Sequence, residues 1–148
     1  MARRTECYVD TAAFIALADT SDSYHSLFRT LFADPPRLIA SALVIAEAHG
    51  WFLRRYDQQK ALQFLTFLNE VPTLGIEAFD APKVGLTAAI LERFKDQKLT
   101  LADAHGLAIM KDRRIEICWS TDWHMSLMGV TLATATASKS RRYRSAEI

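Results

Sequence analysis

The sequence is poor in cysteine, proline and glycine, with two, four and five of them among 148 residues. Cys7 and Cys118 each lie inside a short apolar run, so we interpret them as buried, reduced thiols of the core. Two such cysteines argue against a disulfide framework and against a zinc site. The chain also lacks a glycine-rich phosphate loop and a serine nucleophile elbow. The sequence therefore argues against a nucleotide triphosphatase and against a serine hydrolase.

No apolar run approaches the roughly 18 residues of a membrane-spanning helix. The first residues, MARRTECYVDTAAFIALADT, imitate an export signal, but Glu6 and Asp10 interrupt the apolar part. We therefore expect a soluble, cytoplasmic protein. The formal net charge is only +1, so binding to nucleic acid would have to come from a local arrangement of residues rather than from the overall field.

Half of the residues are hydrophobic, which is enough for one domain with a substantial core. We predict a single domain over residues 1–137. Residues 138–148, SKSRRYRSAEI, are basic and have little apolar content to bury, so we expect a flexible tail there.

Short apolar runs alternate with longer helical patterns along the chain. Strands are predicted at residues 6–9, 37–40, 73–77, 115–119 and 130–134. An apolar stripe predicts a helix over 24–32, and further helices are predicted to start at Ser41, Asp57, Asp80 and Thr100. Strands separated by helices pair in parallel, which places helices on both faces of the sheet. The predicted fold class is therefore α/β, a three-layer α/β/α domain with a central parallel sheet of about five strands.

Two aspartates directly follow predicted strands. Asp10 ends the first strand, in YVDTAAF, and Asp122 follows the fourth, in STDWH. In an open parallel sheet, ligands bind outside the carboxyl ends of the strands, where the strand order reverses. Both acids are predicted at that edge, although helix capping is the simpler role for either one alone.

Two further acids lie within predicted helices. Glu47, in SALVIAEAHGW, comes four residues after Leu43 and three after Val44, so it shares the helical face predicted to pack on the sheet. A carboxylate on such a face needs a partner. Asp103, in LTLADAHGLAIM, also lies on an apolar stripe, but it forms a capping pattern with Thr100, so capping and chemistry both stay open for it.

Convergence of the four acids would require a neutralising partner. At about 4 Å and an effective dielectric near 20, each like-charge pair costs on the order of 4 kcal/mol, against a total stability of roughly 5 to 15 kcal/mol. Either the acids do not converge, or they keep protons at raised pKa values, or a divalent cation neutralises them. Oxygen ligands alone favour one or two Mg²⁺ or Mn²⁺ ions, and such sites suit the hydrolysis of phosphate esters.

In their order and spacing, the segments YVDTAAFIAL, SALVIAEA, LTLADAHGLAIM and STDWHM resemble the motifs of PIN-domain nucleases, particularly the VapC-type toxins of toxin–antitoxin pairs. The resemblance covers residues 6–134. It implies an acidic quartet that binds metal and carries catalysis, supported by two hydroxyls: Asp10, Glu47, Asp103 and Asp122, with Thr11 and Ser120. It also implies a Mg²⁺- or Mn²⁺-dependent endoribonuclease, a homodimer and a cognate antitoxin.

Several basic residues are candidate contacts to RNA phosphates under this resemblance. They are Arg113 and Arg114, after the helix that carries Asp103, and Arg141 and Arg142 in the tail. The alternative for each is a solvated helix end or a solvated terminus.

Other interpretations stay open beside the nuclease. His49, His105 and His124 lie close to the acids in sequence, but we interpret them as structural because imidazole is a poor ligand for Mg²⁺. A haloacid-dehalogenase-type phosphatase would need a second aspartate where Ala12 stands. The rivals that remain are a non-catalytic RNA-binding or interaction domain on the same fold, and a PIN nuclease that is not a toxin.

Overall fold

The structure is a computed structural model that describes residues 5–137. Its five strands are β1 (Glu6–Val9), β2 (Arg37–Ser41), β3 (Leu74–Glu77), β4 (Ile117–Trp119) and β5 (Thr131–Leu132). They form one sheet in the order β3-β2-β1-β4-β5, and every neighbouring pair is parallel. The predicted five-stranded parallel sheet is confirmed.

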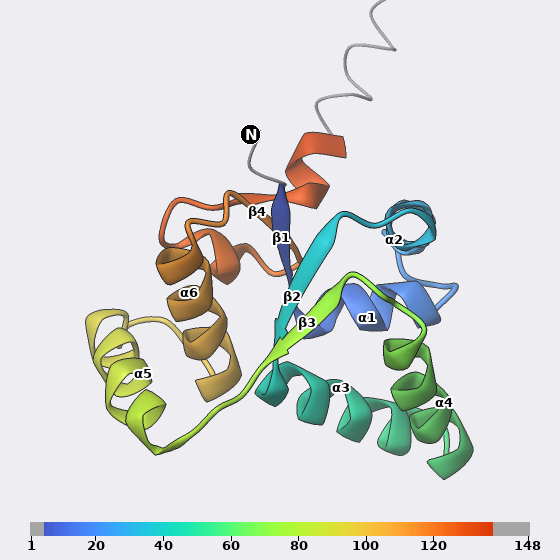
Figure 1. Cartoon of the computed structure of the whole chain (residues 1–148), viewed down its shortest axis with the longest axis horizontal. Coiled ribbons are helices and arrows are strands. Elements are labelled where there is room, and N and C mark those ends of the chain that lie inside the picture. Colours follow the sequence, from blue (N-terminus) through green and yellow to red (C-terminus); the bar gives the residue numbers. More distant parts are fainter. Residues whose placement is uncertain (1–4, 138–148) are drawn as a thin grey trace, which may run out of the picture.

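Helices cover both sides of this sheet. They are α1 (Thr11–Ala18), α2 (His25–Ala33), α3 (Ala42–Arg55), α4 (Gln58–Asn69), α5 (Ala81–Arg93), α6 (Leu101–Arg113) and the short 3₁₀ helix η1 (Trp123–Ser126), and residues 133–137 are also helical. In Figure 1, α5 and α6 lie on one side of the sheet and α1 to α4 gather on the other. The predicted three-layer arrangement is confirmed. Within residues 5–137, no helix is both long and apolar enough to cross a membrane.

Most of the predicted helix starts use the expected capping residues. The Leu43 N–H donates to Ser41 Oγ (3.0 Å), and the Lys60 N–H donates to an Asp57 carboxylate oxygen (2.8 Å). These bonds satisfy backbone donors that a first turn otherwise leaves free. Asp80 precedes α5 as predicted, but its side chain makes no capping hydrogen bond.

The predicted bounds of the last two strands were partly wrong. The strand predicted at 115–119 starts only at Ile117, because Arg114 adopts a left-handed conformation (φ 55°) and the Ile115 N–H still bonds the Met110 carbonyl at the end of α6. The strand predicted at 130–134 has only two residues. Ala133 opens an alanine-rich helical segment instead, in keeping with the high helix propensity of alanine.

Gly106 sets the distance between α6 and the sheet. A Cβ atom at this position would lie 2.7 Å from the Tyr8 hydroxyl oxygen and 2.8 Å from the Met125 methyl group. Both of those side chains are fully buried, so neither can move aside into solvent. The absence of a side chain at Gly106 therefore lets α6, and with it Asp103, approach the sheet closely.

We expect Gly106→Ala to destabilise the protein by about 1 to 3 kcal/mol, because the added methyl group overpacks a filled interior. Thermal unfolding measures the change. Gly85→Ala is the matched control: this exposed glycine of α5 has nothing within 4 Å of an added Cβ, so alanine should raise the stability or leave it unchanged. Equal stabilities of the two variants would contradict the tight packing at Gly106.

Candidate functional site

The strand order reverses between β1 and β4, and two acids follow these neighbouring strands. Val9 pairs with Trp119, and the Asp10 N–H donates to the Trp119 carbonyl (3.0 Å), so the pairing continues one residue past the end of β1. Asp122 follows three residues after Trp119. Asp10 and Asp122 therefore lie at the same edge of the sheet, as the sequence predicted.

Asp103 reaches this edge from α6, whose N-terminal end lies there because the helix leads back to the start of β4. The Asp103 N–H donates to Thr100 Oγ1 (3.1 Å), and Asp103 Oδ2 accepts from the Thr100 N–H (2.9 Å). This is the capping box that the sequence allowed. Capping occupies one oxygen of Asp103 and leaves the other, so the two roles considered for this residue are compatible.

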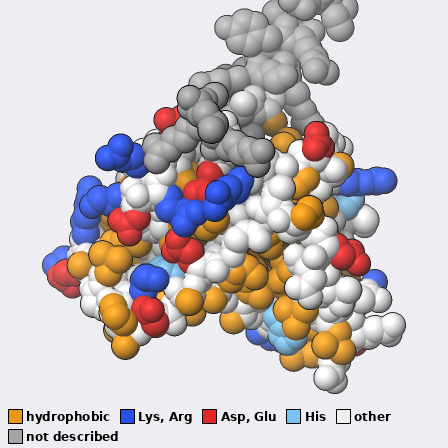
Figure 2. Space-filling model, viewed as in Figure 1, with side chains coloured by type: hydrophobic (Ala, Val, Ile, Leu, Met, Phe, Trp, Pro, Cys, Tyr) orange, Lys and Arg blue, Asp and Glu red, His pale blue; other side chains and the backbone are white. Residues whose placement is uncertain are grey.

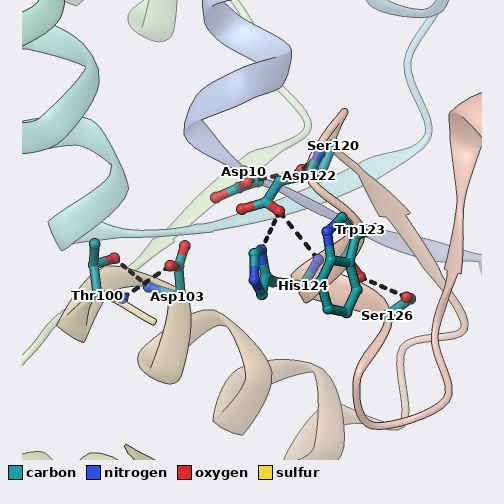
Figure 3. Close-up of polar contacts among 8 residues, drawn as sticks. All are labelled: Asp10, Thr100, Asp103, Ser120, Asp122, Trp123, His124 and Ser126. Carbon is teal, nitrogen blue, oxygen red and sulfur yellow. Dashed lines mark hydrogen bonds and ion pairs between the residues drawn. The ribbon is translucent and has the colours of Figure 1, made fainter. Parts of the chain in front are cut away.

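One carboxylate oxygen from each of Asp10, Asp103 and Asp122 lies within 4.8 Å of the others. Figure 3 shows the three carboxylates turned toward a common space between the start of α6 and the ends of the two strands. Oxygen ligands at this spacing suit a hard divalent cation such as Mg²⁺ or Mn²⁺. We call these three residues the aspartate cluster.

Hydrogen bonds hold the two strand-end acids in place. The Ser120 hydroxyl donates to Asp10 Oδ2 (2.8 Å) and accepts from the Asp122 N–H (3.0 Å), so one side chain joins both. Asp122 Oδ1 accepts from the His124 N–H (3.1 Å) and from His124 Nδ1 (2.6 Å). These partners orient the carboxylates as outer-shell groups commonly orient metal ligands.

The electrostatics of the site centre on Asp10, which is 5% exposed. Burial, together with the charges of Asp103 and Asp122, raises the pKa of its carboxyl from 3.8 to about 7, against the opposing hydrogen bonds from Ser120 and the Thr11 backbone. The cluster thus retains a proton near neutral pH unless a cation compensates its charge.

Glu47 lies beside the aspartate cluster rather than inside it. Partial burial raises its pKa, the Thr11 hydroxyl opposes this shift, and the charge of Asp103 adds to it. The prediction that Glu47 shares the packed face of its helix was wrong: Val44 and Ala48 are buried, but Glu47 is exposed. It sits at the solvent-facing margin of that face.

The Thr11 hydroxyl lies at the site, next to Asp10 and Glu47. Its hydroxyl oxygen is fully buried directly after Asp10, and no described residue completes a well-formed hydrogen bond with it, although it lies close enough to Glu47 to lower the pKa of that carboxyl. Leaving such a group unpaired costs free energy, typically about 1 to 3 kcal/mol. The donor set and this unpaired oxygen both fit a hydrated divalent cation at the site.

The structure assigns a different role to Arg113. Its guanidinium bonds the Glu6 carboxylate (2.7 and 3.1 Å) and the Glu77 carboxylate (2.9 Å). Ten helical residues, or about 15 Å, separate it from Asp103 along α6. These ion pairs give Arg113 a structural role at the opposite end of α6 from the aspartate cluster, where Arg114 also lies, and an RNA contact by either residue stays a prediction. The other candidates, Arg141 and Arg142, lie outside the described residues.

His105 is a core residue, as the structural interpretation holds. It is fully buried, its Nδ1 lies 2.6 Å from Ser41 Oγ, and its ring packs edge-on against Phe79. Burial lowers its pKa, which keeps the ring neutral. The contact joins α6 to the start of α3 and so relates the helices that carry Asp103 and Glu47.

Trp123 is a residue that the sequence did not single out. It follows Asp122 directly, is 57% exposed, and stacks on His124 with 4.1 Å between ring centroids. Trp119 ends an apolar run, whereas Trp123 stands between Asp122 and His124, so its polar neighbours are a weak signal of exposure that only the folded surface settles. Gly106 was missed for a similar reason, since close approach depends on the tertiary partner.

Comparisons with known proteins agree with this geometry. The PIN domain matches residues 7–130, so the chain belongs to the PIN-domain family and the predicted family is confirmed. No curated protein matches the sequence significantly.

Several solved structures share the fold at low sequence identity. VapC20 of Mycobacterium tuberculosis, described as a sarcin-ricin loop cleaving toxin, is 22% identical with a TM-score of 0.75, over 84% of this chain and 96% of that one. A toxin–antitoxin complex from Klebsiella pneumoniae is 20% identical with a TM-score of 0.58, over 86% and 95%. FitAcB from Neisseria gonorrhoeae is 16% identical with a TM-score of 0.60, over 85% and 95%.

Asp10→Asn should change how stability depends on pH in the presence of a chelator. The pKa of Asp10 in the folded protein, about 7, is above its ordinary value of 3.8, so the wild type loses stability as the pH rises between these values. Each pKa unit corresponds to about 1.4 kcal/mol. The neutral variant lacks this loss and should be the more stable of the two at pH 8.

Thermal unfolding from pH 4 to 8 measures this difference. Asp112→Asn, which changes an exposed acid at the other end of α6, should follow the wild-type curve. If the Asp10→Asn curve ran parallel to the wild-type curve, the raised pKa of Asp10 would be wrong.

Proposed function

We propose that this protein is a divalent-metal-dependent endoribonuclease and the toxin of a toxin–antitoxin pair. The observation that carries the proposal is the convergence of Asp10, Asp103 and Asp122 within 4.8 Å at the switch point of the sheet. Membership of the PIN-domain family supports a nuclease, and the descriptions of the similar structures support the toxin role.

The oxygen ligands for one or two Mg²⁺ or Mn²⁺ ions would come from the aspartate cluster, whose members are held by hydrogen bonds. Ser120 fixes Asp10, His124 fixes Asp122, and the capping box fixes Asp103. A bound divalent cation would lower the pKa of an attacking water and stabilise the leaving oxygen of a phosphodiester. The proposal gives Glu47 the role of proton acceptor, because its carboxylate is exposed, is influenced by the charge of Asp103 and has a raised pKa.

The substrate class rests on chemistry and on likeness rather than on overall charge. On the face shown in Figure 2, lysine and arginine side chains lie among acidic ones and form no continuous basic surface. The proposal therefore assigns attraction to phosphates at the site to a cation held by the aspartate cluster rather than to a basic surface on this face. The description of VapC20 as a toxin that cleaves the sarcin-ricin loop supports RNA as the substrate.

Purified protein should cleave labelled RNA only with Mn²⁺ or Mg²⁺, and chelator should stop the reaction. Asp10→Asn and Asp103→Asn keep an oxygen that can accept the existing hydrogen bonds but remove the charge, so each should lower the rate by at least about 100-fold. Ser120→Ala should lower it by about 10- to 100-fold, because it frees both acids to reorient.

Asp112→Asn serves again as the control, since it removes an exposed charge from the same helix far from the cluster, and it should cleave like the wild type. Equal cleavage by wild type and both cluster variants would reveal a contaminating nuclease and favour a non-catalytic RNA-binding domain.

The partners of the protein follow from the same proposal. A toxin requires a cognate antitoxin, and the Klebsiella pneumoniae structure is described as a toxin–antitoxin complex. A homodimer is part of the proposal through the family resemblance.

Expression of the wild type should arrest growth, and expression of Asp103→Asn should not. Co-expression of a small neighbouring reading frame should restore growth and yield a complex on purification. Unimpaired growth, together with robust RNA cleavage in vitro, would point to a PIN nuclease that is not a toxin.

A further inference from the structure

An exposed indole stands directly beside the aspartate cluster. Of the large hydrophobic side chains that the structure describes, none is more exposed than Trp123 at 57%. Trp119, four residues earlier, is buried at 2% and belongs to the core. Core packing therefore does not account for Trp123, and a side chain of this size leaves a large apolar surface in water.

The ring of Trp123 is supported on one face. It stacks on His124 with an angle of 24° between the two planes, and His124 is itself held by Asp122 through the 2.6 Å contact. The Ser126 hydroxyl donates to the Trp123 carbonyl (2.6 Å), which fixes the backbone of this turn. The cluster acid, the imidazole and the indole thus form one connected unit, as Figure 3 shows.

The open side of this stack has the properties of a platform for a nucleobase. A ring supported on one face and exposed elsewhere loses little conformational entropy when a second ring stacks on it. Base–aromatic stacking also tolerates any base, and it does not depend on charge. That matters here, because a net charge of +1 and three clustered aspartates give the chain little attraction of its own for a polyanion.

We propose that Trp123 stacks on a base of single-stranded RNA next to the phosphate bound at the aspartate cluster, and so helps to select the position of cleavage. This inference rests on the proposed ribonuclease function. Trp123 is then a substrate-contacting residue that acts through affinity and register, while the aspartates carry the metal chemistry.

The test is equilibrium binding of fluorescently labelled RNA octamers of adenosine or uridine in Mg²⁺, with Asp10→Asn as the non-cleaving parent. Adding Trp123→Ala should weaken binding by about 5- to 150-fold, the range that loss of one stacked base corresponds to. Trp123→Phe should recover most of the affinity, because it keeps an aromatic face. Thermal unfolding of each variant checks that the fold is retained.

Tyr24→Ala is the matched control. It removes another exposed aromatic ring, 37% exposed, from the turn before α2, and binding should not change.

Octamers that carry single abasic sites separate stacking from other effects of the substitution. For the parent, one abasic position should weaken binding by about the same factor as Trp123→Ala, and in the Trp123→Ala background the same abasic site should cost nothing further. Indole fluorescence of the parent should fall when the adenosine octamer binds, and this quenching should disappear in Trp123→Phe although RNA is still bound.

The inference is overturned if Trp123→Ala binds RNA as tightly as its parent, or if abasic sites weaken both proteins equally. Either result alongside metal-dependent cleavage by the wild type would leave the ribonuclease standing and would reassign the exposed indole to a protein contact. If neither octamer binds and no RNA is cleaved, the ribonuclease proposal and the stacking inference fail together.

Discussion

The hydrogen bond from the Asp10 N–H to the Trp119 carbonyl extends the pairing of β1 and β4 by one residue beyond β1. This extension places Asp10 next to Ser120, whose hydroxyl then reaches both Asp10 and the backbone of Asp122. Without that register, the two acids would leave neighbouring strands at different heights and would not meet. The fold therefore imposes a concentration of like charge at one edge of the sheet, and the rest of the site responds to it.

Each response uses a short-range contact that holds one oxygen of a carboxylate and leaves the other available. Thr100 does so for Asp103, and His124 for Asp122. Burial raises the pKa of Asp10, so its carboxyl can hold a proton when no cation compensates the charge of the cluster. This arrangement links proton release to cation binding, as is general for carboxylate metal sites.

The strand-end acids could be predicted from sequence because the topology of a parallel sheet alone puts Asp10 and Asp122 at one edge. The surroundings of single helical residues could not. Helical spacing predicted Glu47 on the packed face. In the structure the next residue, Ala48, is buried and Glu47 is exposed. The ion pairs of Arg113 could not be predicted either, because its two partners, Glu6 and Glu77, are remote in sequence. Trp123 went unnoticed because exposure is a property of the folded surface.

Asp103 caps the start of α6 by accepting a hydrogen bond from the Thr100 N–H, and its carboxylate also belongs to the aspartate cluster. Asparagine keeps a carbonyl oxygen that can accept from the Thr100 N–H, so the helix start survives while the charge is lost. Aspartate and asparagine codons differ by one base. A single point mutation can therefore remove a charge from the aspartate cluster without removing the hydrogen bond at the start of the helix. The charge at this site is thus easier to lose in evolution than the helix start that positions it.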